Sequence, residues 1–579
     1  MIDRVGKLLL LAAFLTIFGV ATTVIHDFDT FWQLQSGKYM VETQSLIRTD
    51  LFTLAADVPR FEHCWLHDLI LYFGHQLGGY HALSVIKGLA LGGTTLVLLW
   101  AARVRGASWG AMLLLLTPIW LSRGGWTARP QLWTFLFFAL FVLILERHRR
   151  QGGKLVFVLF PLMLLWVNLH AGAILAVPIL AAYLVGEGGA LALGKSTLSR
   201  AEYKRLWLTA GLVLLGFLFT PYTKEFIDTL FSAHQLGGGK GGAPIAQVFN
   251  MDWRPTSFAS DPYFYFSLAL TAMLMVLGWR RLTLTDLCLV GGLAIMGQQL
   301  SRHTSFFFFA MTAILPIYAD NAASWISFRF PLGVKSALRW AATLAAAAIF
   351  IHYALPAYHT YGLFRTGLRT WHFPVAAAEF VKEHRLPANI YNTYDWGGYL
   401  AWTLYPKHRV FWDARQNSAE MFSYGWRVMS GHPGWEGVFE KFDVKTVVTK
   451  ACTVDTGQHY PIIDLLRKDP EWRLVFADVS ALIFVRGDAV AADWLAQYEL
   501  PDSRADDTIL SEARLLVEME PQRYKGWWEI YKIQMARRKY PEAFLALEQY
   551  LRRTPVPDTQ AEALYRILYP LVPQGGAAR

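Results

Sequence analysis

The sequence predicts a mainly α-helical membrane protein, in which about eleven spans precede a small exported α/β domain and a C-terminal helical-hairpin segment. Of the 579 residues, 54% are hydrophobic and only 17% are charged, whereas about a quarter are charged in typical soluble domains. Apolar runs of roughly 16–22 residues recur along the first two thirds of the chain. Basic residues gather between alternate runs, as is typical of cytoplasmic loops.

Run length and the charge bias together define the predicted spans. Arg4 and Lys7 precede the first run, so we expect an uncleaved first span with a cytoplasmic N-terminus. An odd number of spans then exports everything after about residue 355. The runs lie near residues 8–25, 80–101, 107–121, 131–146, 154–169, 171–187, 205–220, 263–279, 283–299, 304–318 and 336–354.

Three parts are expected along the chain: a transmembrane domain at 1–355, an exported α/β domain at 356–490 and a TPR-like helical tail at 491–579. Short β-like runs near 410–412, 446–448 and 481–485 alternate with helical stretches in the second part. The net charge is +10. Nucleic acid is nevertheless not an expected partner, because the basic residues lie mainly between spans.

Five short polar clusters fall where apolar runs break, and the alternation of spans puts all five on the exported side. Charges beside hydrocarbon are costly unless they are paired or used. Their convergence at one membrane face therefore indicates an active site rather than ordinary loops. The clusters are His26–Asp29, Ser122–Pro130, Trp166–His170, Thr220–Lys224 and Ser301–His303.

Asp27 and Asp29 directly follow the first span. Two carboxylates at this spacing can bind a divalent cation, or one can act as a base while the other orients it. A helix cap beside a solvated turn is the alternative. If the protein needs a metal such as Mg²⁺ or Mn²⁺, the predicted ligands are Asp27, Asp29 and Asp50.

Three arginines, Arg123, Arg129 and Arg302, lie on the exported side against the charge bias. A guanidinium can bind phosphate through two parallel hydrogen bonds, so these residues predict a site for a lipid phosphate head group. Snorkelling to the membrane surface is one alternative. An ion pair with an acidic residue of the first loop is another.

Asn168 and His170 end one predicted span, and His303 precedes another. Such side chains can donate hydrogen bonds, and the histidines can exchange protons or bind a metal. We expect all three to contact substrate, with a purely structural role as the alternative.

Glu62 and His63 form a further polar group in the first loop, and we expect them to contact substrate as well. The spacing of His63 and His67 suits a metal on a helix. Glu62 precedes His63 instead of following it, so the HExxH pattern is matched only in part and a zinc protease is not expected.

These motifs resemble the GT-C superfamily of membrane glycosyltransferases. The first-loop run Asp29-Thr-Phe-Trp-Gln-Leu-Gln-Ser-Gly37 and the Trp166–His170 element are similar to those of a group of bacterial multi-span proteins. The tail motifs Asp395–Tyr399 and Asp413–Arg415 are similar as well. The chain departs from the pattern after His170, and it lacks the WWD-type motif of oligosaccharyltransferases, so that activity is not expected.

The resemblance implies an inverting glycosyltransferase of a bacterial inner membrane. Its partners would be a polyprenyl-phosphate-linked sugar, an acceptor protein or glycan, and membrane lipids. Asp29 or Asp27 would deprotonate the acceptor, and the three arginines would stabilise the departing phosphate. Asn168 and the two histidines would orient the phosphate, and the exported tail would position the acceptor.

Two other classes remain open. A transporter or flippase for a lipid-linked substrate predicts charges in mid-span and similar halves, and the sequence indicates neither. A non-catalytic membrane assembly factor would dock its partners through the helical tail.

Overall fold

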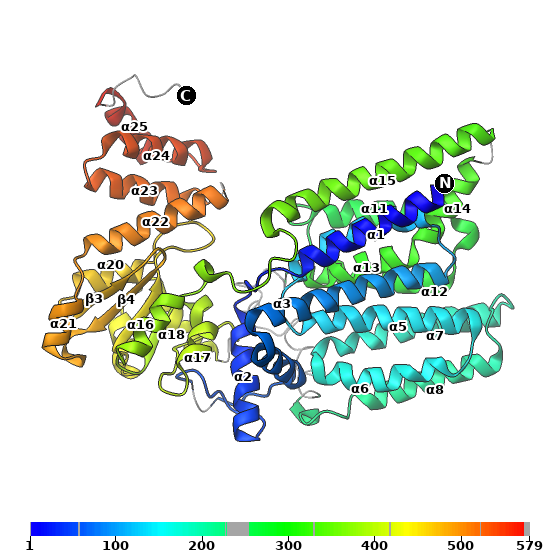
Figure 1. The fold of residues 1–579 in the computed structure, drawn as a ribbon, viewed down its shortest axis with the longest axis horizontal. Helices are drawn as coiled ribbons and strands as arrows, with labels where there is room; N and C mark the ends of the chain where they lie inside the picture. The colour runs from blue at the N-terminus through cyan, green and yellow to red at the C-terminus, as the bar shows by residue number, and fades with distance from the viewer. Residues whose placement is uncertain are drawn as a thin grey trace. The chain divides into compact units, whose positions relative to one another are not determined.

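The computed structural model describes residues 2–55, 58–225, 227, 254–327, 331–415, 418–520 and 523–571. These residues form two compact units (Figure 1). The first unit comprises Met1–Leu46 and Phe61–Leu368, and the second comprises Ile47–Arg60 and Arg369–Arg579. Part of the predicted first exported loop therefore belongs to the second unit. The predicted boundaries at residues 355 and 490 stay predictions.

The first unit is a bundle of helices, and α5, α6, α7 and α8 run alongside one another in Figure 1. Short 3₁₀ helices precede or join some of them, among them η1, η3 and η6. The helices are α1 (Ile2–Ala21), α2 (Asp29–Thr43), α3 (Trp65–Val104), α4 (Trp109–Leu114), η1 (Thr117–Gly125), α5 (Gln131–Gln151), α6 (Leu159–Leu169), η3 (Ala171–Leu175), α7 (Ala176–Ala192), α8 (Arg200–Gly216), α11 (Pro262–Leu277), α12 (Leu284–Gln299), η6 (Ser301–His303), α13 (Thr304–Ile314), α14 (Pro316–Ser327) and α15 (Leu332–Tyr361).

Within the described residues, 5 helices are long and apolar enough to cross a membrane, or 6 if the bent pair Ser301–Ile314 and Pro316–Ser324 is one span. The chain is therefore a multi-pass membrane protein. The apolar helices Lys154–Leu169 and Pro262–Leu277 are shorter. The larger count of about eleven predicted spans stays a prediction.

The span predicted near 107–121 is not one continuous helix. Helix α4 has only 6 residues and ends at Leu114, and η1 follows. Pro118 lies in the first turn of η1. It has no N–H to donate to the Leu114 carbonyl, and its ring would clash with that carbonyl in a continuing α-helix.

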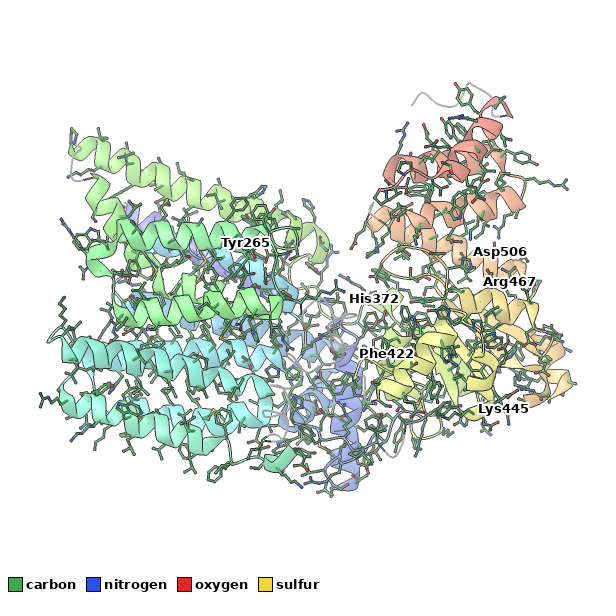
Figure 2. All side chains as sticks on the ribbon, turned by 180° about the vertical axis from the view of Figure 1, so that it is seen from behind. Tyr265, His372, Phe422, Lys445, Arg467 and Asp506 are labelled. Carbon is green, nitrogen blue, oxygen red and sulfur yellow. The ribbon has the colours of Figure 1, made fainter. Side chains whose placement is uncertain are left out.

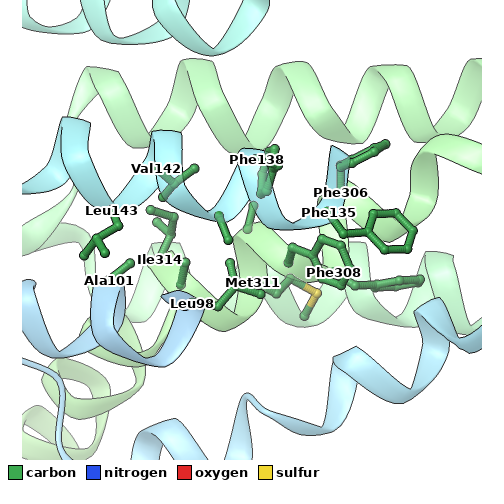
Figure 3. Packing of buried hydrophobic residues seen from close by; sticks show 14 of the residues in the cluster. Leu98, Ala101, Phe135, Phe138, Val142, Leu143, Phe306, Phe308, Met311 and Ile314 are labelled. Carbon is green, nitrogen blue, oxygen red and sulfur yellow. The ribbon is translucent and has the colours of Figure 1, made fainter. Parts of the chain in front are cut away.

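The core of the first unit includes an aromatic contact between the N-terminal halves of α5 and α13. Phe135 and Phe138 of α5 face Phe306 and Phe309 of α13, with ring centroids between 4.9 and 6.3 Å apart. Figure 3 shows Leu98 of α3 in the same cluster. This packing fixes the N-terminal ends of α5 and α13 beside each other, and both ends follow predicted polar clusters.

The opposite end of α5 carries a set of buried ion pairs. Arg105 lies 2.8 Å from Glu146 and 2.6 Å from Asp286 between nitrogen and oxygen atoms. Arg149 lies 2.5 Å from Glu187. Four of these charges are at most 2% exposed in their side chains, namely Arg105, Glu146, Glu187 and Asp286. Each cation therefore has a carboxylate beside it, as burial requires.

The second unit contains a four-stranded sheet in the order β1-β2-β4-β3. Strand β1 (Ile390–Asn392) runs parallel to β2 (Thr446–Lys450), and β4 (Ala481–Arg486) is antiparallel to both β2 and β3 (Trp472–Ala477). The strands predicted near 446–448 and 481–485 are confirmed. The run at 410–412 contributes only isolated bridges, from Val410 to Thr53 and Ile390.

Helices surround this sheet and continue beyond it to the C-terminal end. Arg467 of α20 and Asp506 of α22, both labelled in Figure 2, form an ion pair of 2.9 Å. The helices are α16 (Val375–Glu383), α17 (Gly397–Leu404), α18 (Ala419–Met429), α19 (Trp435–Lys441), α20 (Pro461–Lys468), α21 (Ala492–Tyr498), α22 (Ser503–Met519), α23 (Lys525–Ala536), α24 (Tyr540–Arg553) and α25 (Thr559–Leu568).

A histidine links α20 to the tail helix α23. Nδ1 of His459 lies 2.8 Å from Glu529, and Nε2 lies 3.0 Å from Asp464. Burial disfavours the charged ring, but the hydrogen bonds to Asp464 and Glu529 outweigh it and raise the pKa of His459 to about 9. The ring is therefore protonated at neutral pH.

We expect Arg105→Gln to destabilise the first unit strongly, by about 3–5 kcal/mol, because it leaves buried Glu146 and Asp286 without their main cation. Thermal unfolding of the purified protein, followed by tryptophan fluorescence, measures the effect. Arg147→Gln is the matched control, because Arg147 is exposed at the same end of α5. Equal melting temperatures of the two variants would contradict the prediction.

We expect the second unit to lose stability as the pH rises. Since the folded pKa of His459 is about 9 and the unfolded value is about 6.5, the contribution of this ring is complete below about pH 6.5 and is lost as the pH rises through about 9. His459→Asn should remove this slope from the melting temperature, whereas the exposed control His432→Asn should keep it. A slope that survives His459→Asn would assign it to another group.

Candidate functional site

Three of the predicted polar clusters, His26–Asp29, Ser122–Pro130 and Trp166–His170, meet around the N-terminal end of α5. Arg129 precedes this helix by two residues, and Trp133 and Thr134 lie in its first turn. Each of the three side chains contacts a polar residue of another element. The first turn of α5 therefore links the first loop to the Trp166–His170 element.

Arg129 pairs with both aspartates of the first cluster. Its Nε lies 2.7 Å from Oδ2 of Asp27 and 3.2 Å from Oδ2 of Asp29. Asp27 also accepts the backbone N–H of Asp29 at 2.9 Å, and Trp32 donates its indole N–H to Asp29 at 3.2 Å. The side chain of Asp27 is 7% exposed and that of Asp29 is 20% exposed. Asp29 is thus the carboxylate more accessible to a ligand.

His67 connects α3 to α2 and α5. Trp133 donates to its Nδ1 at 2.9 Å, and the amide oxygen of Gln33 lies 3.3 Å from its Nε2. The histidine is 1% exposed. Both ring nitrogens therefore have neighbours within the protein, which fixes the packing of the first loop on the bundle.

Asn168 uses its amide to hold three segments together. Its Oδ1 accepts the indole N–H of Trp65 at 2.9 Å. Its Nδ2 donates to the carbonyls of Leu164 and Phe219, each at 2.8 Å. This geometry gives Asn168 an anchoring role, and the predicted contact with substrate stays a prediction.

His170 lies at the end of α6 and contacts α5. Its Nδ1 is 2.6 Å from the hydroxyl of Thr134, and the same hydroxyl accepts the indole N–H of Trp166 at 2.9 Å. Burial, and then the positive charge of Arg302, lower the pKa of His170 well below its ordinary value. His170 is therefore neutral at physiological pH, and Arg302 lies close enough to affect it.

The remaining predicted ligands lie in less regular segments. Arg302 and His303 form η6 directly before α13. Glu62 is buried, and His63 is half-buried with its ring 5.9 Å from that of Phe61. Arg123 is exposed in η1, and its guanidinium has no ion pair or hydrogen bond to any residue that the structure describes.

The three aspartates of the predicted metal site are divided between the two units, and the site stays a prediction. Asp50 belongs to the second unit, where its Oδ1 lies 3.2 Å from Arg415 and its Oδ2 accepts the hydroxyl of Thr53 at 2.6 Å. Asp27 and Asp29 are paired with Arg129. In the described part of the chain, no group of three or more His, Cys, Asp and Glu side chains is placed to hold a metal ion.

Sequence reasoning missed several polar residues near the site. Lys87 lies inside the apolar run of the second predicted span, is 1% exposed and donates to Thr23 at 3.1 Å. This lysine corrects the expectation that the spans carry no internal charge. A cation inside an apolar run could have indicated a functional or paired residue from the sequence alone, because burying a charge in the membrane is costly. Gln33, Trp133 and Thr134 carry no such signal, since polar and aromatic residues are common at span ends.

No family model matches the sequence, and no curated protein does. Similar solved structures include ArnT from Cupriavidus metallidurans bound to undecaprenyl phosphate, with 13% identity, coverage of 84% of this chain and 98% of that chain, and a TM-score of 0.49. The arabinofuranosyltransferase AftD from Mycobacteria shares 14% identity over 83% of this chain and 41% of that chain, with a TM-score of 0.52. The likeness to the arabinofuranosyltransferase shows a shared fold, so the predicted GT-C-like fold is confirmed.

We expect Asn168→Asp to lower the melting temperature, because a carboxylate cannot donate to the carbonyls of Leu164 and Phe219. The loss of both donors should cost about 2–4 kcal/mol. Gln151→Glu is the matched control, because this exposed residue needs only its acceptor oxygen, for Arg147. An unchanged melting temperature for Asn168→Asp would contradict the anchoring role.

Proposed function

We propose that the protein transfers a sugar from a polyprenyl-phosphate donor to a hydroxyl of a protein or glycan acceptor, on the exported face of a bacterial inner membrane. The observation that carries the proposal is the cluster of Asp27, Asp29 and Arg129, which lies at the end of a membrane helix within a GT-C-like fold. The fold alone does not specify a reaction. The chemistry of these residues supports this one.

Asp29 is the base in the proposed reaction. Its carboxylate takes the proton of the acceptor hydroxyl, and the resulting oxygen attacks the anomeric carbon from the side opposite the phosphate. The bond between the anomeric carbon and the phosphate oxygen breaks, and the phosphate leaves with the electron pair. Asp27 is less exposed and bonds both Arg129 and the backbone of Asp29. It therefore orients Asp29.

Cationic and neutral donors suit the departing phosphate. Arg302 lies near enough to His170 to lower its pKa, so a positive charge and an imidazole share one region. Arg123 adds an exposed guanidinium without a partner in the described residues. Groups of this kind stabilise the negative charge that develops on a leaving phosphate.

An apolar groove supports a lipid-linked donor. It lies between α11, α12 and α13, where Leu268, Met275, Val290 and Phe307 line it. Phe307 follows His303 by one helical turn, so the groove begins close to η6. A polyprenyl chain in this groove would bring its phosphate toward Arg302.

The charges at the two ends of α5 support the proposed orientation. The last turn of α5 contains His148, Arg149 and Arg150, which fits the cytoplasmic side under the positive-inside rule. The aspartate–arginine cluster at the other end then faces the exported side. In this orientation the second unit is exported and positions the acceptor.

We expect Asp29→Asn to abolish transfer while the protein still folds and inserts, because the amide cannot accept the hydroxyl proton. Mass spectrometry of lipids and glycans from a deletion strain that carries the variant measures this. The expected result is accumulation of the polyprenyl-phosphate sugar and loss of the glycan product. Glu42→Gln is the control, because it removes an exposed carboxylate from the same helix. Normal product in the Asp29→Asn strain would eliminate the proposed base.

A further inference from the structure

The hydroxyl of Thr134 joins two ring systems. The indole N–H of Trp166 can only donate, so at 2.9 Å the Thr134 oxygen is its acceptor. The same oxygen lies 2.6 Å from Nδ1 of His170. Thr134 and Trp166 are each fully buried. Their hydrogen bonds are therefore shielded from exchange with water.

The hydroxyl hydrogen of Thr134 has one good acceptor. Buried threonines in helices commonly donate to the carbonyl one turn earlier, as Thr94 and Thr95 of α3 do at 2.8 and 2.9 Å. Thr134 makes no such bond among the described residues. If His170 Nδ1–H donated instead, the Thr134 hydrogen would be buried without an acceptor, which is costly.

Glycine is required beside this hydrogen bond. A Cβ atom on Gly172 would lie 2.5 Å from the Thr134 oxygen and 2.6 Å from Nδ1 of His170. Either partner would have to move to admit a side chain. Gly172, two residues after His170, thus leaves room for the contact between Thr134 and His170.

We propose that Thr134, supported by Trp166, is a positioning residue that fixes His170 as the neutral tautomer with its proton on Nε2, so that Nε2–H donates to a phosphate oxygen. This inference rests on the proposed function. Since Nδ1 accepts from Thr134, the single proton of the neutral ring is on Nε2. The imidazole is half-buried, and its Nε2 has no hydrogen bond to a described residue.

The contrast with His67 supports a ligand for His170. Both nitrogens of His67 have neighbours within the protein, Trp133 and Gln33. His170 has a protein partner on one nitrogen only, within the described residues. A neutral Nε2–H of His170 near Arg302 can donate a hydrogen bond to an anion. Because the ring is uncharged, this adds no second buried positive charge beside that arginine.

The test is nitrogen NMR of the full-length protein in nanodiscs with ¹⁵N-labelled histidine. The signals of His170 are those lost in His170→Gln. We expect an unprotonated, hydrogen-bonded Nδ1 and a protonated Nε2 in the wild type and in Thr134→Ser, which keeps the hydroxyl. Thr134→Val should shift the Nδ1 signal. Thr94→Val, the matched control, should leave it in place, because it removes a hydroxyl that donates within α3.

Undecaprenyl phosphate is then titrated into the same nanodiscs. We expect the Nε2 signal of His170 to shift in the wild type and in Thr134→Ser, with binding roughly tenfold or more weaker in Thr134→Val, the size expected for one hydrogen bond to a charged group. Thr94→Val should bind as the wild type does. If Thr134 only filled space, Thr134→Val would not shift the Nδ1 signal of His170. Thr134→Ser would then not preserve binding of undecaprenyl phosphate.

Two results would overturn the inference, and both differ from a failure of the proposed function. A protonated Nδ1 in the wild type, which needs no variant to fold, would refute the assigned tautomer. The assigned tautomer with no response of Nε2 to undecaprenyl phosphate would refute the ligand. Product formation that persists in Asp29→Asn refutes the transferase mechanism, and it leaves the tautomer of His170 unaffected.

Discussion

A charge next to hydrocarbon must have a partner, and this constraint governs both ends of α5. The helix has 21 residues, which at 1.5 Å per residue span about 30 Å, the thickness of the hydrocarbon core. At one end the Arg105 side chain is 2% exposed among carboxylates. At the other end the Arg129 side chain is 36% exposed between two aspartates. The ion pairs of Arg105 are buried and stabilise the bundle, whereas those of Arg129 remain accessible to water and ligands.

Tryptophans connect the polar residues at the N-terminal end of α5 to the apolar core. Each of four indoles lies partly among the helices and donates its N–H to a polar group near the end of α5. The pairs are Trp32 with Asp29, Trp65 with Asn168, Trp133 with His67 and Trp166 with Thr134. Because an indole ring is rigid and its N–H direction is fixed, these contacts hold the polar groups in defined positions beside the packed phenylalanines of α5 and α13.

The sequence predicted the helical membrane class and two strands, because hydrophobic periodicity and run length are local properties. It also predicted that the early aspartates and Arg129 share one membrane face. It did not predict that Arg129 bonds both carboxylates, or that Asp50 pairs with Arg415, since pairing depends on how helices pack. Thr134 was missed for the same reason. A threonine in an apolar run has no local sign of a histidine 36 positions later.

An ion pair with an acidic residue of the first loop was the alternative to phosphate binding by Arg129, and the pair with Asp27 is compatible with a catalytic role for Asp29. A base must be held in place before the acceptor arrives, and a charged neighbour does this at no reorganisation cost during the reaction. The shorter bond goes to Asp27, at 2.7 Å, and the longer one goes to Asp29, at 3.2 Å. The more exposed carboxylate thus makes the longer bond to Arg129. Exposure separates the two arginines, because Arg105 also bonds two carboxylates but both are buried, whereas Asp29 is 20% exposed and can meet an acceptor.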